Sequence, residues 1–201
     1  MIQKLVPILL LPALAFSQQA NRIHRKAIVV DSHNDILTAS IEKKVSMDDN
    51  LKGKTHSDLQ RWKEGGLDVQ LFSVWCDGEK PEPYQFANRE MDILDAIVQK
   101  NPDKIALTKN TREIQQAVKA GKIAAMFGVE GGHMIENSLD KLNHLFERGA
   151  RYMTLTWNNS TSWATSAWDE TSKKDSLSKT HKGLTDFGKQ VVKRMNELGM
   201  M

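Results

Sequence analysis

The sequence predicts an α/β fold built from parallel strand–helix–strand units. Apolar runs typical of strands alternate with amphipathic segments typical of helices, and no internal repeat or linker divides the chain. Polar side chains also follow the strands at their carboxyl ends, where (β/α)8 barrels place their functional groups. An open doubly wound sheet would carry a site at the same strand ends, so this second observation favours half of a barrel without excluding the open sheet.

The elements can be placed from hydrophobic periodicity and from residues that begin and end helices. The expected strands are residues 27–30, 67–76, 105–107 (short), 123–130 and 151–157. The expected helices are a short one within 36–49, then 57–64, 84–100, 111–120, 138–149 and 185–198, with Ser57, Thr111, Ser138 and Thr185 as N-caps. Residues 158–180 read as a long polar loop that is rich in tryptophan. Because the chain stops after a helix, where a further strand is due, we expect a barrel truncated after about half its strands.

Composition narrows the class of protein. The 201 residues carry a net charge of +3, and lysine and glutamate are interspersed without a basic block, so we expect no nucleic-acid partner. Cys76 is the only cysteine, which excludes an intramolecular disulfide and a zinc site built from several cysteines. Since Cys76 lies in an apolar strand, it is expected to be a small buried hydrophobe.

The first residues have the layout of a secretory signal peptide. Lys4 precedes an apolar run over residues 5–16, and Ala15 and Ser17 place small residues at a cleavage site. The run is too short to span a membrane, and no cysteine follows it that would receive a lipid. We therefore expect a signal peptide over 1–17 with cleavage near Ser17, one domain over 18–201, and a secreted or periplasmic protein. An uncleaved anchor is the alternative.

A candidate metal site follows the first strand. Asp31, His33 and Asp35 alternate with Ser32 and Asn34, so on an ideal strand their side chains project from one side. A divalent metal is the simplest partner for such a group, because histidine nitrogen and aspartate oxygen are normal zinc ligands. The alternative is a solvated junction between strand and loop.

Glu130 is the expected partner of His33 and Asp35. It ends the strand 123–130, on a face of mostly small residues that suits a crowded barrel interior. A carboxylate in this position can bridge two metal ions that activate a water for hydrolysis. Gly131 and Gly132 follow it and let backbone approach a site closely. The alternative is an ion pair between Glu130 and a lysine or arginine.

Several segments of the chain resemble one known family. They are DSHND at 31–35, GGLDVQLFS at 65–73, GVEGGH at 128–133, LFERGARYMTLT at 145–156 and GLTDFGKQVVKRMNELGM at 183–200. In these segments, which are spread in order over nearly all of the expected mature chain, the sequence resembles the membrane dipeptidases of the renal dipeptidase type. Those proteins are zinc enzymes with a (β/α)8 TIM-type barrel of the metal-dependent amidohydrolase class.

The resemblance implies a function and a set of ligands. His33 and Asp35 would hold one Zn²⁺, Glu130 would bridge to a second, and a hydroxide between the two ions would attack the peptide carbonyl of a dipeptide. The two histidines of the second zinc and the aspartate that serves as general acid/base come from later strands of the family and are not matched in this chain. We therefore expect the isolated chain to fold poorly and to lack dipeptidase activity.

Several interpretations stay open. Trp157 stands where many family members carry a substrate-contacting histidine, so Trp157 and Asn158 are candidate substrate-binding residues; alternatively, the tryptophans of this loop are buried anchors. His133 is a candidate for lining the pocket or binding metal. The alternative functions are another binuclear amidohydrolase acting on a cyclic amide or N-acyl amino acid, and an inactive truncated metal-binding remnant. A homodimer is also open.

Overall fold

The structure is a computed structural model that describes residues 19–172 and 183–201. The signal peptide expected at 1–17 and the last part of the long loop therefore lie outside the described residues. The strands are β1 (Val30–Asn34), β2 (Val69–Val74), β3 (Ile105–Leu107), β4 (Ile123–Glu130) and β5 (Ala150–Thr154). The helices are α2 (Ile36–Lys43), α3 (Leu59–Gly65), α4 (Pro83–Lys100), α5 (Thr111–Lys119), α6 (Leu139–Arg148), α7 (Ala167–Ser172) and α8 (Asp186–Leu198), with a 3-10 turn, η1 (Gly132–Ile135).

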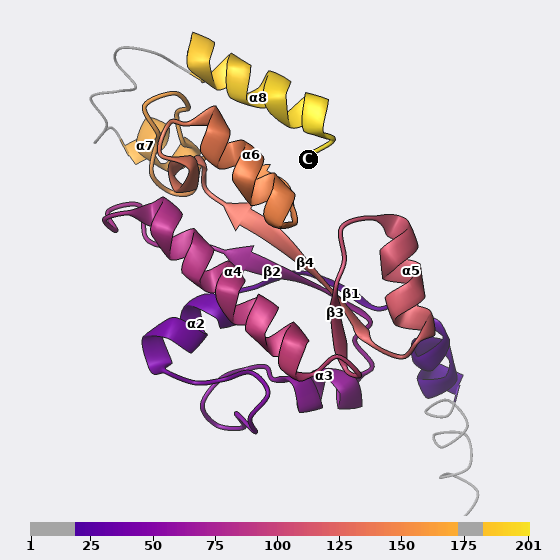
Figure 1. Cartoon of the computed structure of the whole chain (residues 1–201). Helices are drawn as coiled ribbons and strands as arrows, with labels where there is room; N and C mark the ends of the chain where they lie inside the picture. Colours follow the sequence, from indigo (N-terminus) through magenta and orange to yellow (C-terminus); the bar gives the residue numbers. More distant parts are fainter. Residues whose placement is uncertain (1–18, 173–182) are drawn as a thin grey trace, which may run out of the picture.

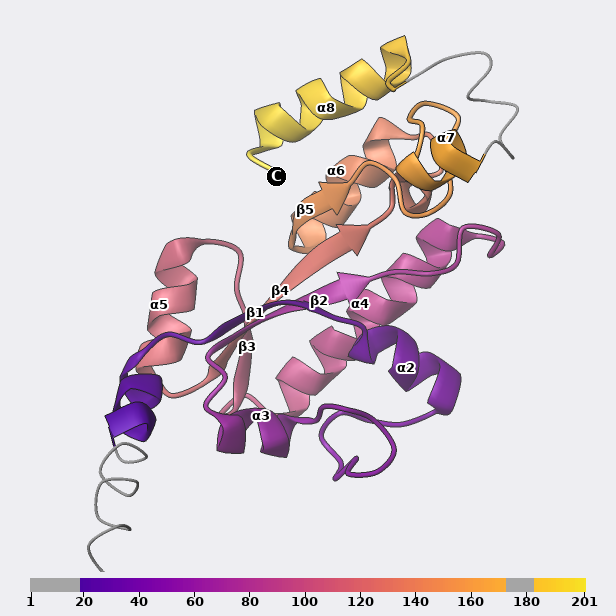
Figure 2. The same cartoon turned by 180° about the vertical axis from the view of Figure 1, so that it is seen from behind.

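The described strands form one parallel sheet in which β4 is central (Figures 1 and 2). One edge of β4 pairs with β2, which in turn pairs with β1. The other edge is shared: β3 pairs with the first part of β4, and β5 pairs with its last part. The parallel α/β architecture predicted from the sequence is thus confirmed, with β2 directly beside β4 although β3 lies between them in the chain.

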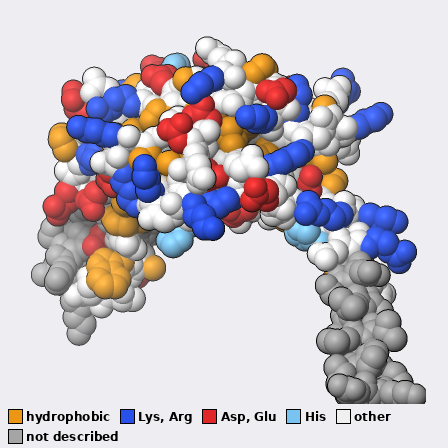
Figure 3. All heavy atoms as spheres, turned by 90° about the horizontal axis from the view of Figure 1, so that it is seen from below, with side chains coloured by type: hydrophobic (Ala, Val, Ile, Leu, Met, Phe, Trp, Pro, Cys, Tyr) orange, Lys and Arg blue, Asp and Glu red, His pale blue; other side chains and the backbone are white. Residues whose placement is uncertain are grey.

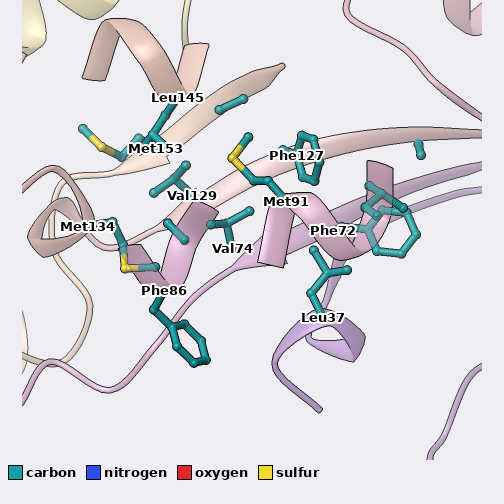
Figure 4. Packing of buried hydrophobic residues seen from close by; sticks show 14 of the residues in the cluster. Leu37, Phe72, Val74, Phe86, Met91, Phe127, Val129, Met134, Leu145 and Met153 are labelled. Atoms are coloured by element: carbon teal, nitrogen blue, oxygen red, sulfur yellow. The ribbon is translucent and has the colours of Figure 1, made fainter. Parts of the chain in front are cut away.

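The main hydrophobic core lies on one face of this sheet. Large side chains of β2 and β4 point into it, among them Phe72 and Phe127, and meet side chains of α4 such as Met91. Figure 4 shows this packing, to which Leu145 of α6 and Leu37 of α2 also contribute. Each of these five side chains is fully buried, so this face fixes the strands against the helices that follow them.

The opposite face of β4 carries the small residues that the sequence predicts for an interior face. Helix α5 packs against the beginning of this face, where Ala117 meets Ala124 and the partly buried Met126. Towards the carboxyl end of β4 the same face continues with Gly128 and Glu130. Helix α5 therefore covers one end of the face, and the carboxylate lies at the other.

The predicted position of the first strand is wrong. The sequence predicts a buried strand over 27–30, whereas β1 covers Val30–Asn34, and Ile28 and Val30 are 58% and 56% exposed. Among the described strands β1 pairs with β2 only, and neither Ile28 nor Val30 belongs to a buried core cluster of the described residues. Their hydrophobicity alone could not distinguish an edge strand from a central one.

Two of the four predicted helix caps are confirmed. Ser138 caps α6 and Thr185 caps α8, each accepting a hydrogen bond from the backbone three residues on. For the other two helices the prediction is off by one residue: Asp58, not Ser57, caps α3, and Asn110, not Thr111, caps α5. Asp58 and Asn110 have the extended backbone of a cap, and the side-chain oxygen of each accepts a hydrogen bond from a backbone N–H of the first helical turn.

The long loop is more ordered than a polar linker. It contains the short helix α7, and Trp163 within it is 1% exposed, which confirms that residue as a buried anchor. Cys76 is buried as predicted, and burial raises the pKa of its thiol to about 12, so it stays protonated at neutral pH.

Two further features concern membrane-spanning helices and the distribution of surface charge. None of the helices in the described part of the chain is long and apolar enough to cross a membrane. Figure 3 shows lysine and arginine side chains interspersed with aspartate and glutamate over the face that it presents, as the sequence indicates.

Candidate metal centre

Three side chains from separate parts of the sheet converge at its carboxyl edge. His33 lies on β1, Asp35 directly follows β1 at the start of α2, and Glu130 is the last residue of β4. The His33 Nε2 atom lies 3.2 Å from Asp35 Oδ1 and 3.2 Å from Glu130 Oε2. One ligand atom from each residue lies within 4.8 Å of the others. The structure therefore brings together the three residues that the sequence predicted as ligands.

The convergence does not arise from simple alternation along β1. One extra residue interrupts the pairing of β1 with β2 between Asp31 and Asn34, and Asp35 already has a turn conformation. Asp31, which the sequence analysis placed on the same side as His33, is not part of the group. Its Oδ1 atom instead accepts a hydrogen bond from the backbone N–H of His33 at 3.2 Å. Asp31 lines the same pocket as His33 and Asp35 but lies outside the ligand group.

The carboxylates of Asp35 and Glu130 have no lysine or arginine partner among the described residues. Both carboxylates face His33. Glu130 accepts one hydrogen bond from the Ser73 hydroxyl at 3.2 Å. The alternative of an ion pair between Glu130 and a basic residue is thus not seen. One imidazole nitrogen and two carboxylate oxygens are a donor set that fits a divalent metal ion.

Tyr152 of β5 is a site residue that the sequence analysis missed. Its hydroxyl oxygen lies 3.5 Å from His33 Nδ1, whereas the two carboxylates face the other ring nitrogen, Nε2. Burial, followed by the negative charges of Glu130 and Asp35, raises the pKa of the Tyr152 hydroxyl. Gly128 was the available signal, because a glycine inside a strand often marks a close approach of another group.

The candidate substrate-binding residues lie beyond β5. Trp157 packs edge-on against Trp75, which follows β2, with ring centroids 5.1 Å apart. Asn158 is exposed. A Cβ atom on Gly131, the residue after Glu130, would lie 3.3 Å from Cβ of Trp157, so this tryptophan stands beside the end of β4. Trp75 was not singled out from the sequence.

His133 is near these residues without joining the ligand group. Its Nε2 atom lies 3.0 Å from the carbonyl oxygen of Cys76, and its Nδ1 atom is buried with no hydrogen-bond partner in the described structure. Burial lowers the pKa of His133, which favours the neutral ring. Of the two roles considered from the sequence, the geometry favours a place in the wall beside Trp157.

Comparison with known proteins decides the family. The family model described as membrane dipeptidase (Peptidase family M19) matches residues 17–201. The chain belongs to the membrane dipeptidase family. As the family is one of metallopeptidases, membership implies dependence on a metal, in agreement with the donor set formed by His33, Asp35 and Glu130.

Solved structures of membrane dipeptidases and similar proteins share the fold. The dipeptidase AC, a metallopeptidase of this family, is 22% identical with a TM-score of 0.73, and the match covers 87% of this chain and 55% of that one. The probable dipeptidase PvdM from Pseudomonas aeruginosa is 20% identical with a TM-score of 0.72, covering 92% and 48%. A metallopeptidase from Rhodobacter sphaeroides, liganded with a phosphinate mimic of the dipeptide L-Ala-D-Ala, is 20% identical with a TM-score of 0.72, covering 87% and 57%.

These matches establish the α/β barrel class of the chain and show how much of a barrel the chain contains. The chain spans about half the length of the solved structures that it matches. Its parallel sheet with flanking helices corresponds to about half of a dipeptidase TIM barrel, as the alternation of strands and helices predicted.

Proposed function

We propose that this chain is part of a zinc-dependent dipeptidase that hydrolyses the peptide bond of dipeptides. One observation carries the proposal: His33 Nε2 and two carboxylates lie within 4.8 Å of one another at the carboxyl ends of β1 and β4, in a chain of the membrane dipeptidase family. In barrel enzymes this edge of the sheet bears the catalytic groups. No lysine or arginine of the described chain forms an ion pair with the two carboxylates, which leaves them available to a metal ion.

The three residues are proposed to have different roles in binding metal. His33 and Asp35 are proposed to hold one zinc ion, and Glu130, the least exposed of the three, to bridge that ion and a second one. When bound, such a pair supplies an activated water and polarises the scissile carbonyl. Ser73 donates to Glu130 Oε2 and thereby orients the bridging carboxylate.

Trp157 and Asn158 are proposed to contact the dipeptide. Trp157 stands next to the end of β4, and its contact with Trp75 gives it a fixed edge-to-face orientation. The two rings would form an apolar wall beside the ligands, and exposed Asn158 would offer a polar amide at its rim.

The described residues bring one histidine and two carboxylates to the site, which suffices for one zinc ion. We therefore expect the 201-residue chain to bind zinc without hydrolysing dipeptides. Zinc binding is measured by competition with a chromophoric chelator, and hydrolysis with Gly-D-Phe. Robust zinc-dependent turnover of Gly-D-Phe by the purified chain would show that the expectation of inactivity is wrong.

Glu130→Gln tests the ligand set. We expect it to weaken zinc binding about 100-fold or more, because a neutral amide is a poor ligand and changes outside the ligand set already cost 10–100-fold. Glu136→Gln is the matched control: Glu136 pairs with Lys141 away from the group and should leave zinc affinity unchanged. Equal zinc affinity of Glu130→Gln and the unaltered chain would contradict the assignment.

The location of the protein is also a proposal. Residues 1–17 have the charge, apolar run and small residues of a signal peptide, and the family match begins at residue 17. We propose that residues 18–201 belong to one dipeptidase barrel domain that is secreted or periplasmic. N-terminal sequencing of the exported chain tests this, and a product that still begins at Met1 would contradict cleavage. Whether the protein forms a homodimer remains a prediction, which analytical ultracentrifugation of the purified protein would test.

A further inference from the structure

We propose that Tyr152 is a positioning residue that holds the His33 ring so that Nε2 faces the metal site. The inference rests on the proposed metal site and adds a residue outside the ligand set. Three observations lead to it: the orientation of the His33 ring, the space that Gly128 leaves for the tyrosine ring, and the irregular pairing of β4 with β5.

The His33 ring presents its two nitrogens to different partners. Nε2 faces Asp35 and Glu130, each at 3.2 Å. Nδ1 faces the Tyr152 hydroxyl at 3.5 Å, at the outer limit of hydrogen-bond range. Among the hydrogen bonds of the described residues, Tyr152 is the partner recorded for Nδ1. The ring is 42% exposed, so packing alone does not fix its orientation.

Tyr152 reaches His33 because Gly128 has no side chain. Gly128 and Tyr152 are direct neighbours across β4 and β5. A Cβ atom built on Gly128 would lie 1.9 Å from Cζ and 2.3 Å from the hydroxyl oxygen of Tyr152, so the tyrosine ring occupies the space of that missing side chain. Any other residue at position 128 would displace the ring from the strand surface.

An irregularity in β5 directs the tyrosine to this place. Phe127 pairs with Ala150 and Gly128 pairs with Tyr152, so Arg151 is an extra residue on β5. Such a bulge changes which face the following side chain takes. With it, Tyr152 lies on the face of Gly128, which is also the face on which Glu130 ends β4.

The chemistry of a metal-binding histidine explains what Tyr152 does. Nε2 can bind a metal only with its lone pair free, so the proton of the neutral ring must be on Nδ1. The Nδ1–H group then donates to the Tyr152 hydroxyl oxygen, which accepts. Metal-binding histidines usually have such a partner on the second nitrogen, and it fixes both tautomer and ring orientation.

The test measures zinc affinity of the 201-residue chain rather than hydrolysis. Tyr152→Phe keeps the ring against Gly128 and removes only the acceptor oxygen, so we expect zinc to bind about 10-fold more weakly. The chain has two tyrosines, and Tyr84→Phe is the matched control: Tyr84 bonds to His144 away from the ligands and should leave the affinity unchanged. His33→Ala gives the loss expected for a true ligand.

The outcomes separate this proposal from the proposed function. If the unaltered chain is folded by circular dichroism and binds no zinc, the metal site and the role of Tyr152 are both wrong. If the unaltered chain binds zinc and Tyr152→Phe binds it equally well, only the role of Tyr152 is wrong. If Tyr152→Phe loses zinc as completely as His33→Ala, Tyr152 is a ligand and not a positioning residue.

A second measurement does not depend on whether the variant folds. Nitrogen NMR of the zinc-loaded, unaltered chain reports which ring nitrogen of His33 carries the proton, with His33→Ala to assign the signals. We expect the proton on Nδ1 in the unaltered chain, and slower exchange of that proton with water than for the ring proton of exposed His56. A His33 ring protonated on Nε2, or an Nδ1 proton that exchanges as freely as that of exposed His56, would overturn the proposal.

Discussion

At the residue scale, Glu90 is a buried acid that the sequence does not reveal. It lies on α4, has no exposed surface, and contacts Thr38 of α2 and the backbone N–H of Trp75, at 2.6 Å and 2.8 Å. Burial is the largest influence and raises the pKa of Glu90 to about 8, although the two hydrogen bonds act in the opposite direction. The Thr38 hydroxyl has one proton and also lies 3.2 Å from the carbonyl oxygen of Trp75. A protonated Glu90 satisfies all of these groups, because it donates to Thr38 while Thr38 donates to that carbonyl.

The raised pKa of Glu90 predicts a pH-dependent stability. Between about pH 5 and pH 8 the folded chain holds a proton on Glu90 that the unfolded chain has released, so this group lowers the free energy of unfolding as pH rises, by about 1.4 kcal/mol per pH unit. Glu90→Gln cannot ionise, so this contribution should vanish in the variant. From pH 5 to pH 8 the free energy of unfolding of the variant should therefore rise relative to that of the unaltered chain. Urea unfolding at several pH values measures it; parallel stability curves for the two proteins would show that Glu90 ionises normally.

At the element scale, Trp163 anchors the described part of the long loop after β5 to other elements. Trp163 packs edge-on against Phe187 of α8, with centroids 6.2 Å apart, and its carbonyl oxygen accepts a hydrogen bond from the N–H of Thr185, the cap of α8. A Cβ atom on Gly132 would lie 2.4 Å from the Trp163 ring, so η1 also closes against it. Trp163 thus ties together the loop, the turn after Glu130 and the last helix.

Removal of this anchor should be costly. Trp163→Ala is expected to lower the free energy of unfolding by about 3–5 kcal/mol, the range for deletion of a fully buried tryptophan. Trp168→Ala in the same loop is the control, since Trp168 is 63% exposed and its removal should change stability by less than about 0.5 kcal/mol. Equal midpoints in urea for the two variants would contradict the anchoring role of Trp163.

At the scale of the whole molecule, the sheet has one edge with exposed apolar residues. β1 pairs with β2 on one side, and Ile28 and Val30 are exposed beside it. At the other side of the sheet the chain returns after α8, where Met201 exchanges backbone hydrogen bonds with Arg151 and Met153 of β5. A strand edge with exposed apolar side chains is a template for pairing with another chain.

This edge predicts self-association of the 201-residue chain. We expect association to increase with concentration in analytical ultracentrifugation, and the double variant Ile28→Lys, Val30→Lys to reduce it, because charge on an edge strand opposes pairing. Trp168→Lys removes exposed apolar surface from a helix and should have a smaller effect. A chain that stays monomeric at all concentrations, or equal effects of the two changes, would contradict association through β1.

The fold was predictable because its signals are local. Each strand and helix carries its own hydrophobic period, and an alternation of the two leads to a parallel sheet whose carboxyl ends share one edge. For the same reason His33, Asp35 and Glu130 could be named as candidate ligands from their places at strand ends. The details that differ depend on neighbouring strands: β1 begins three residues later than expected, and a bulge interrupts its pairing with β2 between Asp31 and Asn34.

The sequence by itself determined the class of fold, the family and the three candidate ligands, since all of these depend on residue types within short segments. Only the tertiary structure decided which side chains support them. Tyr152 contacts His33, 119 residues away in the sequence, because its ring fills the space beside Gly128. Glu90 contacts Thr38, 52 residues away in the sequence. Such contacts depend on strand register and on the packing of separate elements, and no periodicity within one segment encodes either of them.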